Sequence, residues 1–189
     1  MEKNTNFREN RQLAWIVFAV VIILAVILSG GGGLRGAREK ALRVYRAGVD
    51  GSGIGVRTDL GKRVECAYNL ASLAGNYKDA VSEDRIKAME AAAKAVGSAG
   101  ESDMKALAEA NASMTHAVES LYTDLTNTSL SEKDERYALK EYTEFTSRAF
   151  TMAKDSYNNE ADTFNAKLGR FPASIVGKLT RVASLPLFR

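Results

Sequence analysis

The sequence predicts an all-α protein in which a single N-terminal transmembrane helix precedes an antiparallel bundle of long helices, of the four-helix type. Three observations indicate this class. One long uncharged apolar stretch lies near the N-terminus. No proline, the strongest helix breaker, occurs between Met1 and Phe171. Alanine is abundant, and apolar residues recur every three or four positions, which is the period of amphipathic helices.

The N-terminal apolar stretch predicts a membrane anchor. Residues 13–28 are sixteen consecutive apolar residues, and six more uncharged residues extend the run to Leu34. A helix over residues 13–34 has about 22 residues and measures roughly 33 Å, enough to cross a hydrocarbon core of about 30 Å. A short basic tail at residues 1–12 precedes it, and Trp15 lies where interfacial aromatic residues are typical.

A cleaved secretory signal peptide is the alternative interpretation of this stretch. Lys3, Arg8 and Arg11 would form its basic region. The small residues from Ser29 to Gly31 offer a cleavage site, and cleavage there would leave a secreted bundle. The apolar run is longer than the usual signal core of about 7–15 residues, so we favour the uncleaved anchor.

Two glycine clusters predict interruptions of the helical chain. Gly30 to Gly33 are expected to break the helix where it leaves the bilayer and to form a flexible hinge, because glycine loses the most entropy in a helix. A short basic helix over residues 34–46 would follow. The second cluster, Gly48 to Gly55, predicts a turn. A phosphate-binding loop is disfavoured there because no Gly-Lys-Ser/Thr pattern occurs.

The bundle is predicted over residues 35–170, as helices joined by short loops. One helix spans residues 56–77. A second begins after the N-cap Ser82 and ends near Gly97. A third follows an apolar seam over residues 104–125, whose spacing is similar to that of a coiled coil.

Asn111 lies within that seam, at a position that apolar residues occupy in a coiled coil. It is either a polar residue satisfied by a neighbouring side chain or a determinant of register and partner choice, and the residues leave both interpretations open.

The last helix of the bundle is predicted as one uninterrupted element. A capping box of Ser129 and Glu132 would begin it, and its apolar stripe continues to Leu168. Aromatic residues and alanines alternate on that stripe, which favours core packing against a neighbouring helix. Gly169 and the Phe-Pro step that follows it are expected to end the helix.

Residues 171–189 predict a basic, amphipathic C-terminal tail that begins with a short helix. No acidic residue follows Asp162, whereas basic residues recur. The tail would either lie on an anionic bilayer surface or dock on the bundle with its basic face in solvent, because both use the same apolar stripe. The residues expected to contact a membrane surface are Lys167, Arg170, Lys178 and Arg181.

Two spaced motifs resemble those of a known family. Two aromatic–asparagine pairs stand seven residues apart, a Phe-Pro step follows seven residues later, and an Arg-x-Asp-Leu element lies upstream. The residues of these motifs are Arg57, Asp59, Leu60, Tyr157, Asn158, Phe164, Asn165, Phe171 and Pro172. On these motifs, together with the anchor and the length, the chain is similar to the LemA family.

The resemblance implies an antiparallel bundle on a single-pass anchor, with a short external N-terminus and a cytoplasmic bundle, and it assigns no catalytic residues. Seven residues are about two helical turns, so Tyr157 lies above Phe164 and Asn158 above Asn165. Paired asparagines beside an apolar seam can hydrogen-bond across helices or cap a neighbouring chain end. We interpret them as structural determinants, with a polar partner site as the alternative.

The sequence offers few residues for catalysis or metal binding. His116, the single histidine, falls on the solvent side of its seam, without the Glu-x-x-His spacing of di-iron bundles. Cys66, the single cysteine, is interpreted as a small buried apolar residue. We therefore expect no catalytic residue, no metal and no cofactor, and a protein that is not an enzyme. A net charge of +3 is too small to indicate nucleic acid binding.

The expected function is that of a membrane-anchored scaffold or interaction module at the bacterial cell envelope. Its expected partners are the lipid bilayer, an unidentified protein and a second copy of the chain. A receptor-like sensor is the alternative, which a glycine hinge disfavours because a flexible joint transmits rotation poorly. Five basic residues from Arg35 to Arg46, against three before the anchor, favour a single-pass inner-membrane protein with a cytoplasmic bundle.

Overall fold

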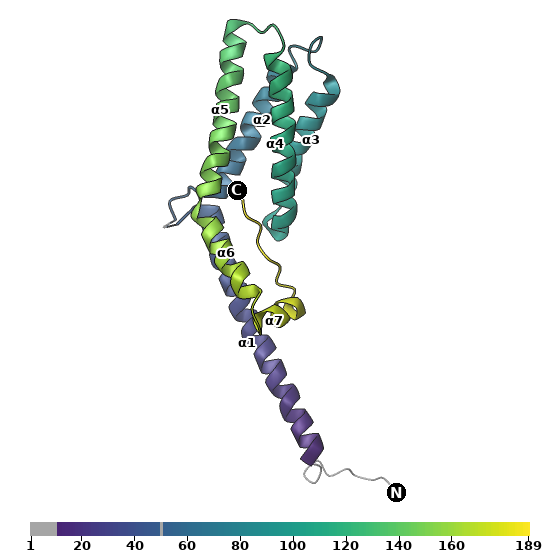
Figure 1. The fold of residues 1–189 in the computed structure, drawn as a ribbon, viewed down its shortest axis with the longest axis vertical. Helices are drawn as coiled ribbons and strands as arrows, with labels where there is room; N and C mark the ends of the chain where they lie inside the picture. Colours follow the sequence, from purple (N-terminus) through teal and green to yellow (C-terminus); the bar gives the residue numbers. More distant parts are fainter. Residues whose placement is uncertain (1–10, 50) are drawn as a thin grey trace.

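The computed structural model describes residues 11–49 and 51–189, and its helices form two layers (Figure 1). The upper layer is an antiparallel four-helix bundle of α2 (Val56–Ala74), α3 (Glu83–Ser98), α4 (Met104–Thr126) and α5 (Glu132–Lys154). The lower layer consists of α1 (Arg11–Ala47), α6 (Ser156–Leu168) and α7 (Ala173–Thr180). The described ranges contain no strand, so the predicted all-α class is confirmed. Lys3 and Arg8 of the predicted basic tail lie outside these ranges.

The first helix, α1, has two halves with different surroundings. Its N-terminal half projects from the body of the molecule and exposes large apolar side chains, from Trp15 (66% exposed) to Leu28 (76% exposed). By length and composition this is a helix that could cross a membrane. Its C-terminal half packs against α6, α7 and α2 and buries Leu34, Leu42 and Tyr45.

The predicted helix break at Gly30 to Gly33 is wrong, because α1 is one helix of 37 residues that passes through these glycines. A Cβ on Gly31 would lie 2.8 Å from Thr180 Cγ2, and one on Gly30 would lie 3.3 Å from Val176 Cγ1. These two glycines let α7 approach the backbone of α1 closely. Packing of this kind offsets the helix penalty of a glycine, which is about 1 kcal/mol relative to alanine.

The second glycine cluster is a turn, as predicted. Gly48, Gly51 and Gly53 have φ angles of 73°, 66° and 77°, a region that side chains disfavour. A Cβ on Gly55 would lie 2.6 Å from the carbonyl oxygen of Tyr45. The glycines therefore allow the chain to leave α1 and enter α2 through a tight loop.

The bundle is held by an apolar core to which each of its helices contributes. In α2 the stripe of Leu60, Ala67, Leu70 and Ala74 is buried between α3, α4 and α5. The predicted seam of α4 is buried apart from Asn111, and it packs on α2, α3 and α5 of the same chain. The buried seam residues are Met104, Leu107, Met114, Val118, Leu121 and Leu125.

The last predicted helix is two helices, which corrects the expectation of one uninterrupted element. Asp155 is the C-cap of α5 and the N-cap of α6, with an extended backbone (ψ 142°). Its Oδ1 accepts a 2.7 Å hydrogen bond from the backbone N–H of Tyr157, which begins a new helix.

The predicted start of α5 is also corrected. Its N-cap is Ser131, whose Oγ accepts from the Asp134 N–H at 3.2 Å, rather than Ser129. The cap lies two residues later because Asp134 stands three residues after Ser131 and hydrogen-bonds its hydroxyl group.

Candidate functional site

Three residues of the spaced motif, Tyr157, Asn158 and Asn165, bind the C-terminal segment, residues 182–189, which has no helix or strand of its own. After α7 the chain reverses and runs back along α6 to the base of the four-helix bundle, as the yellow trace in Figure 1 shows. Leu185 and Phe188 are buried, with exposed fractions of 2% and 3%. The segment therefore forms part of the core that joins the two layers.

Two asparagines of α6 bind the main chain of this segment. The Asn165 amide donates to the carbonyl of Leu185 at 2.7 Å, and its Oδ1 accepts from the Leu185 N–H at 2.9 Å. Asn158 makes the same pair of bonds with Phe188, at 3.1 Å and 2.9 Å. Each side chain thus satisfies both polar groups of one peptide residue, as a paired strand would.

The spacing of the two asparagines matches the repeat of an extended chain. Seven helical residues rise about 10.5 Å, and three residues of extended or polyproline II chain span about 9–10 Å. Asn165 and Asn158 therefore meet residues 185 and 188 of a segment that runs antiparallel to α6. The seven-residue repeat of the motif is the length that this contact requires.

Three aromatic rings, from α1, α6 and the C-terminal segment, pack against one another at this site. The ring of Tyr157 lies 5.6 Å from that of Tyr45 and 5.8 Å from that of Phe188, between ring centroids. The Tyr157 hydroxyl donates to the Pro186 carbonyl at 2.9 Å. Burial raises the pKa of Tyr45 to about 12 and also raises the pKa of Tyr157. Tyr157 is therefore protonated at neutral pH and available as a donor.

Asn158 has a second role at the junction of α5 and α6. Its amide nitrogen also lies within hydrogen-bond distance of the carbonyls of Met152 (2.8 Å) and Ala153 (3.2 Å), at the C-terminal end of α5, so three carbonyls share its two N–H groups. The Met152 carbonyl also accepts from the backbone N–H of Asp155 at 3.1 Å, a contact typical of the last turn of a helix. One buried side chain therefore joins the end of α5, the start of α6 and the C-terminal segment.

The upstream motif connects α2 with α5. Asp59 is fully buried, and its Oδ1 accepts from Arg148 Nη1 at 3.1 Å, while Arg148 also pairs with Glu144. Leu60 belongs to the core, whereas Arg57 is exposed and lies 3.8 Å from Glu101. The motif thus supplies one buried carboxylate, paired with the partly exposed Arg148, and one core residue.

A polar cluster around the buried Arg63, next to this motif, is absent from the sequence-based prediction. Arg63 is 1% exposed, donates to Asn111 Oδ1 and to Thr115 Oγ1 (2.7 Å), and lies 4.0 Å from the centroid of the Phe145 ring. Burial lowers the pKa of Arg63 to about 10. This contact agrees with the first interpretation of Asn111, a polar residue satisfied by a neighbour. The sequence does contain a signal for this cluster, because Arg63 stands four residues after Asp59 and therefore lies on the same face of α2.

The C-terminal segment ends beside this cluster. A cavity of about 320 Å³ is bordered by Arg63, Asn111, Thr115 and His116 on one side and by residues 187–189 on the other. Within the described residues, no group of three or more His, Cys, Asp or Glu side chains could hold a metal ion. This arrangement of side chains can recognise an extended main chain through hydrogen bonds.

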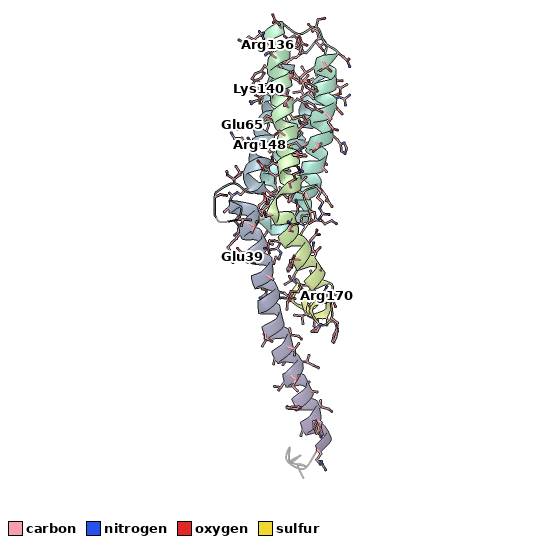
Figure 2. The ribbon with its side chains drawn as sticks, turned by 60° about the vertical axis from the view of Figure 1, so that its left-hand side comes forward. Glu39, Glu65, Arg136, Lys140, Arg148 and Arg170 are labelled. Atoms are coloured by element: carbon pink, nitrogen blue, oxygen red, sulfur yellow. The ribbon has the colours of Figure 1, made fainter. Side chains whose placement is uncertain are left out.

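The structure does not bring the rest of the predicted residues to this site. Phe164 is a core residue, while Phe171 (81% exposed) and Pro172 lie exposed at the corner between α6 and α7. The four basic residues Lys167, Arg170, Lys178 and Arg181 are exposed. Figure 2 shows Arg170 at the end of the body near α1, and Arg136 and Lys140 at the opposite end.

A family model described as the LemA family matches residues 53–189, a range that includes both motifs, the bundle and the C-terminal segment. No curated protein and no solved structure matches the chain.

Proposed function

Because the chain belongs to the LemA family, we propose that it is a non-enzymatic interaction module, anchored by one helix in the bacterial inner membrane. The observation that carries this proposal is the division of α1. One half of this helix exposes apolar side chains along its length, and the other half is built into the folded body.

The exposed half of α1 needs an apolar environment. Trp15, Phe18 and Leu24 are each more than half exposed, as are several of their neighbours. Full burial of one such side chain is worth about 1.5–3 kcal/mol, and a bilayer supplies that burial for the whole stretch. The second half of α1 positions the bundle outside the bilayer.

The placement of the reactive side chains supports a role other than catalysis. His116 is exposed on α4, and Cys66 is buried in α2, so the two do not form a nucleophile–base pair. The exposed faces of the bundle carry ion pairs between neighbouring turns, such as Lys87 with Glu83 and Arg136 with Glu132. Surfaces of this kind suit reversible contacts with a protein partner or with a second copy of the chain.

Crosslinking in intact membranes, followed by mass spectrometry, tests the interaction module. We expect crosslinks from lysines of α3 to α5 to one recurring protein or to another copy of this chain. Crosslinks that vary between preparations would contradict the proposal. Extraction of vesicles with alkaline carbonate tests the anchor, because an integral protein stays in the pellet. The intact mass of the mature chain separates the anchor from a cleaved signal peptide.

The cytoplasmic placement of the bundle is testable by thiol labelling in intact cells. His116→Cys, in a background with Cys66→Ser, presents an exposed thiol on α4. A membrane-impermeant maleimide should label it only after the cells are lysed. Labelling of intact cells would place the bundle on the outer side of the membrane.

A receptor-like sensor is the second candidate, and the continuity of α1 favours it. The objection from a flexible hinge no longer applies, because the helix is unbroken from Arg11 to Ala47. Four glycines inserted after Gly33 would uncouple the two halves of α1. An interaction module would keep its crosslinked partners after this insertion, whereas a sensor would lose them or hold them in one fixed state.

A further inference from the structure

The short helix α7 uses one face for docking and leaves another face uncovered. Val176 and Gly177 are buried against α1 and α6, with Leu168 beside Gly177. In contrast, Phe171 is 81% exposed, Ile175 52% and Leu179 60%. Ile175 and Leu179 stand four residues apart and therefore share one face of α7, and Phe171 lies at the corner just before this helix begins. Part of the apolar surface of α7 therefore remains without a protein partner among the described residues.

The position of α7 relates this uncovered face to the proposed bilayer. Val176 and Thr180 contact Gly30 and Gly31 of α1, which follow the run of sixteen apolar residues after the single residue Ser29. In Figure 1, α7 lies across α1 near the middle of that helix, below the bundle. If residues 13–34 cross the membrane, Gly30 and Gly31 lie at the last turn of the span, so α7 lies at the boundary between the hydrocarbon core and the lipid headgroups.

The charges around α7 are of one sign. Lys167, Arg170, Lys178 and Arg181 are exposed, and the nearest charged residue of α1 after the apolar run is Arg35, which is also exposed. The last acidic residue of the chain, Asp162, is paired with Arg189. An apolar face rimmed by unopposed cations is typical of helices that bind anionic membrane surfaces.

We propose that α7 is an interfacial helix that inserts Phe171, Ile175 and Leu179 into an anionic bilayer leaflet, while the surrounding Lys and Arg side chains bind lipid phosphates. The inference rests on the proposed membrane anchor. The geometry points to a bilayer as the occupant of this uncovered face. A face at the edge of the membrane, beside a spanning helix, is within reach of lipid before it is within reach of a soluble protein. The contact would fix the body of the protein relative to the membrane.

A single-tryptophan experiment with the full chain tests the proposal. In a Trp15→Phe background, Leu179→Trp places the only tryptophan on the uncovered face of α7, and Leu139→Trp places it at an exposed apolar position on α5, in the bundle. Each variant is reconstituted into vesicles of phosphatidylcholine, with or without phosphatidylglycerol. Lipids brominated at shallow or deep acyl positions serve as quenchers.

The expected result is specific to α7. Leu179→Trp should be quenched by lipids brominated at shallow positions, and its emission should shift to the blue when phosphatidylglycerol is added. Leu139→Trp should show neither change. Addition of Lys178→Glu and Arg181→Glu should remove the dependence on phosphatidylglycerol, whereas Lys133→Glu on α5 should preserve it. Ile175→Trp provides an independent second reporter.

The outcomes separate this inference from the proposed anchor. Trp15 of the unmodified chain reports on the anchor, and absence of its quenching by brominated lipid would overturn both proposals. Quenching of Trp15 without quenching of Leu179→Trp would overturn the interfacial helix alone. A blue-shifted but unquenched Leu179→Trp would show that protein, such as a second copy of the chain, covers this face. That result would also overturn the interfacial helix.

Discussion

At the scale of single residues, two asparagine side chains determine how the C-terminal segment is held. A carboxamide presents a donor and an acceptor side by side, which match the C=O and N–H of one residue in an extended chain. Asn165 makes this contact with Leu185, and Asn158 makes it with Phe188. A carboxylate or an aliphatic side chain offers only one of these groups or neither, which gives a physical reason for asparagine at both positions.

Replacement of Asn158 should destabilise the fold far more than replacement of its neighbour Asn159. Asn158→Ala removes partners from Phe188 and from the carbonyl of Met152, and each buried bond is worth about 1 kcal/mol. We expect a loss of about 2–4 kcal/mol in the free energy of unfolding, measured by urea denaturation in detergent. Asn159→Ala, at an exposed position, should change it by less than about 0.5 kcal/mol. Equal effects would refute the proposed contact.

The thiol of Cys66 should resist alkylation in the native protein. Burial raises its pKa to about 11, with a further contribution from Glu141. Because the thiolate is the reactive species, a shift of two units predicts labelling by iodoacetamide about a hundredfold slower than at an exposed cysteine. His116→Cys in the Cys66→Ser background is the exposed reference, and denaturation with urea should restore the reactivity of Cys66. Fast native labelling would show that the site opens readily.

At the scale of the elements, contacts between distant helices decide where helices continue and where they end. In α1, Gly30 and Gly31 remain helical because α7 packs against them. Between α5 and α6, Asp155 caps both helices, and Asn158 binds the carbonyls released at the end of α5. A similar apolar stripe on both sides of Asp155 gives no indication of the interruption.

The glycines of α1 should differ in their tolerance of larger side chains. A Cβ on Gly31 would lie 2.8 Å from Thr180, whereas a Cβ on Gly32 would have no neighbour within 4 Å. Gly31→Leu should therefore destabilise the protein by about 1–3 kcal/mol through overpacking. Gly32→Leu should be neutral or stabilising by up to about 1 kcal/mol, because leucine favours the helix. Thermal unfolding in detergent measures the change in stability of both variants. Faster tryptic cleavage after Lys178 in Gly31→Leu would report the release of α7 from α1.

At the scale of the whole molecule, the C-terminal segment joins the two helical layers. The rings of Tyr45 of α1, Tyr157 of α6 and Phe188 of the segment contact one another below the bundle, with Tyr45 stacked on Phe188 and edge-on to Tyr157. The segment continues to the cavity beside Arg63, which residues of α2, α4 and α5 border. Besides this contact, α1 continues into α2 through the glycine turn, and α5 is linked to α6 at Asp155. The last residues of the chain therefore contribute to the relative position of α1 and the bundle, together with the packing of α1 on α2 and the ion pair of Arg46 with Glu101.

Truncation of Phe188 should loosen the lower layer selectively. Phe188→Ala removes the buried ring and should cost about 3–5 kcal/mol, as for other buried phenylalanines. Amide hydrogen exchange should rise most in α6 and in the C-terminal half of α1, and least in α3 and α4. Phe150→Ala, at a site 62% exposed, is the control and should leave the exchange of α6 unchanged. A uniform rise along the chain would mean that the two layers unfold as one unit.

The sequence by itself determined the all-α class, the apolar stretch of α1, the turn at Gly48 to Gly55 and the positions of α2, α3 and α4. These features follow from local properties, namely periodicity, glycine and proline placement, and length, which act within a few residues of the chain. The spacing of the motif also indicated that Asn158 and Asn165 act together on one face of a helix.

Only the tertiary structure decided the continuity of α1, the break at Asp155, the partners of the two asparagines and the burial of Arg63. Each of these depends on a contact between residues far apart in the chain, such as Gly31 with Thr180 or Asn111 with Arg63. The free energies of such contacts equal or exceed local propensities of about 1 kcal/mol per residue. The residue whose contact overrides a local helix propensity can be identified only in the folded structure, where the two residues lie next to each other.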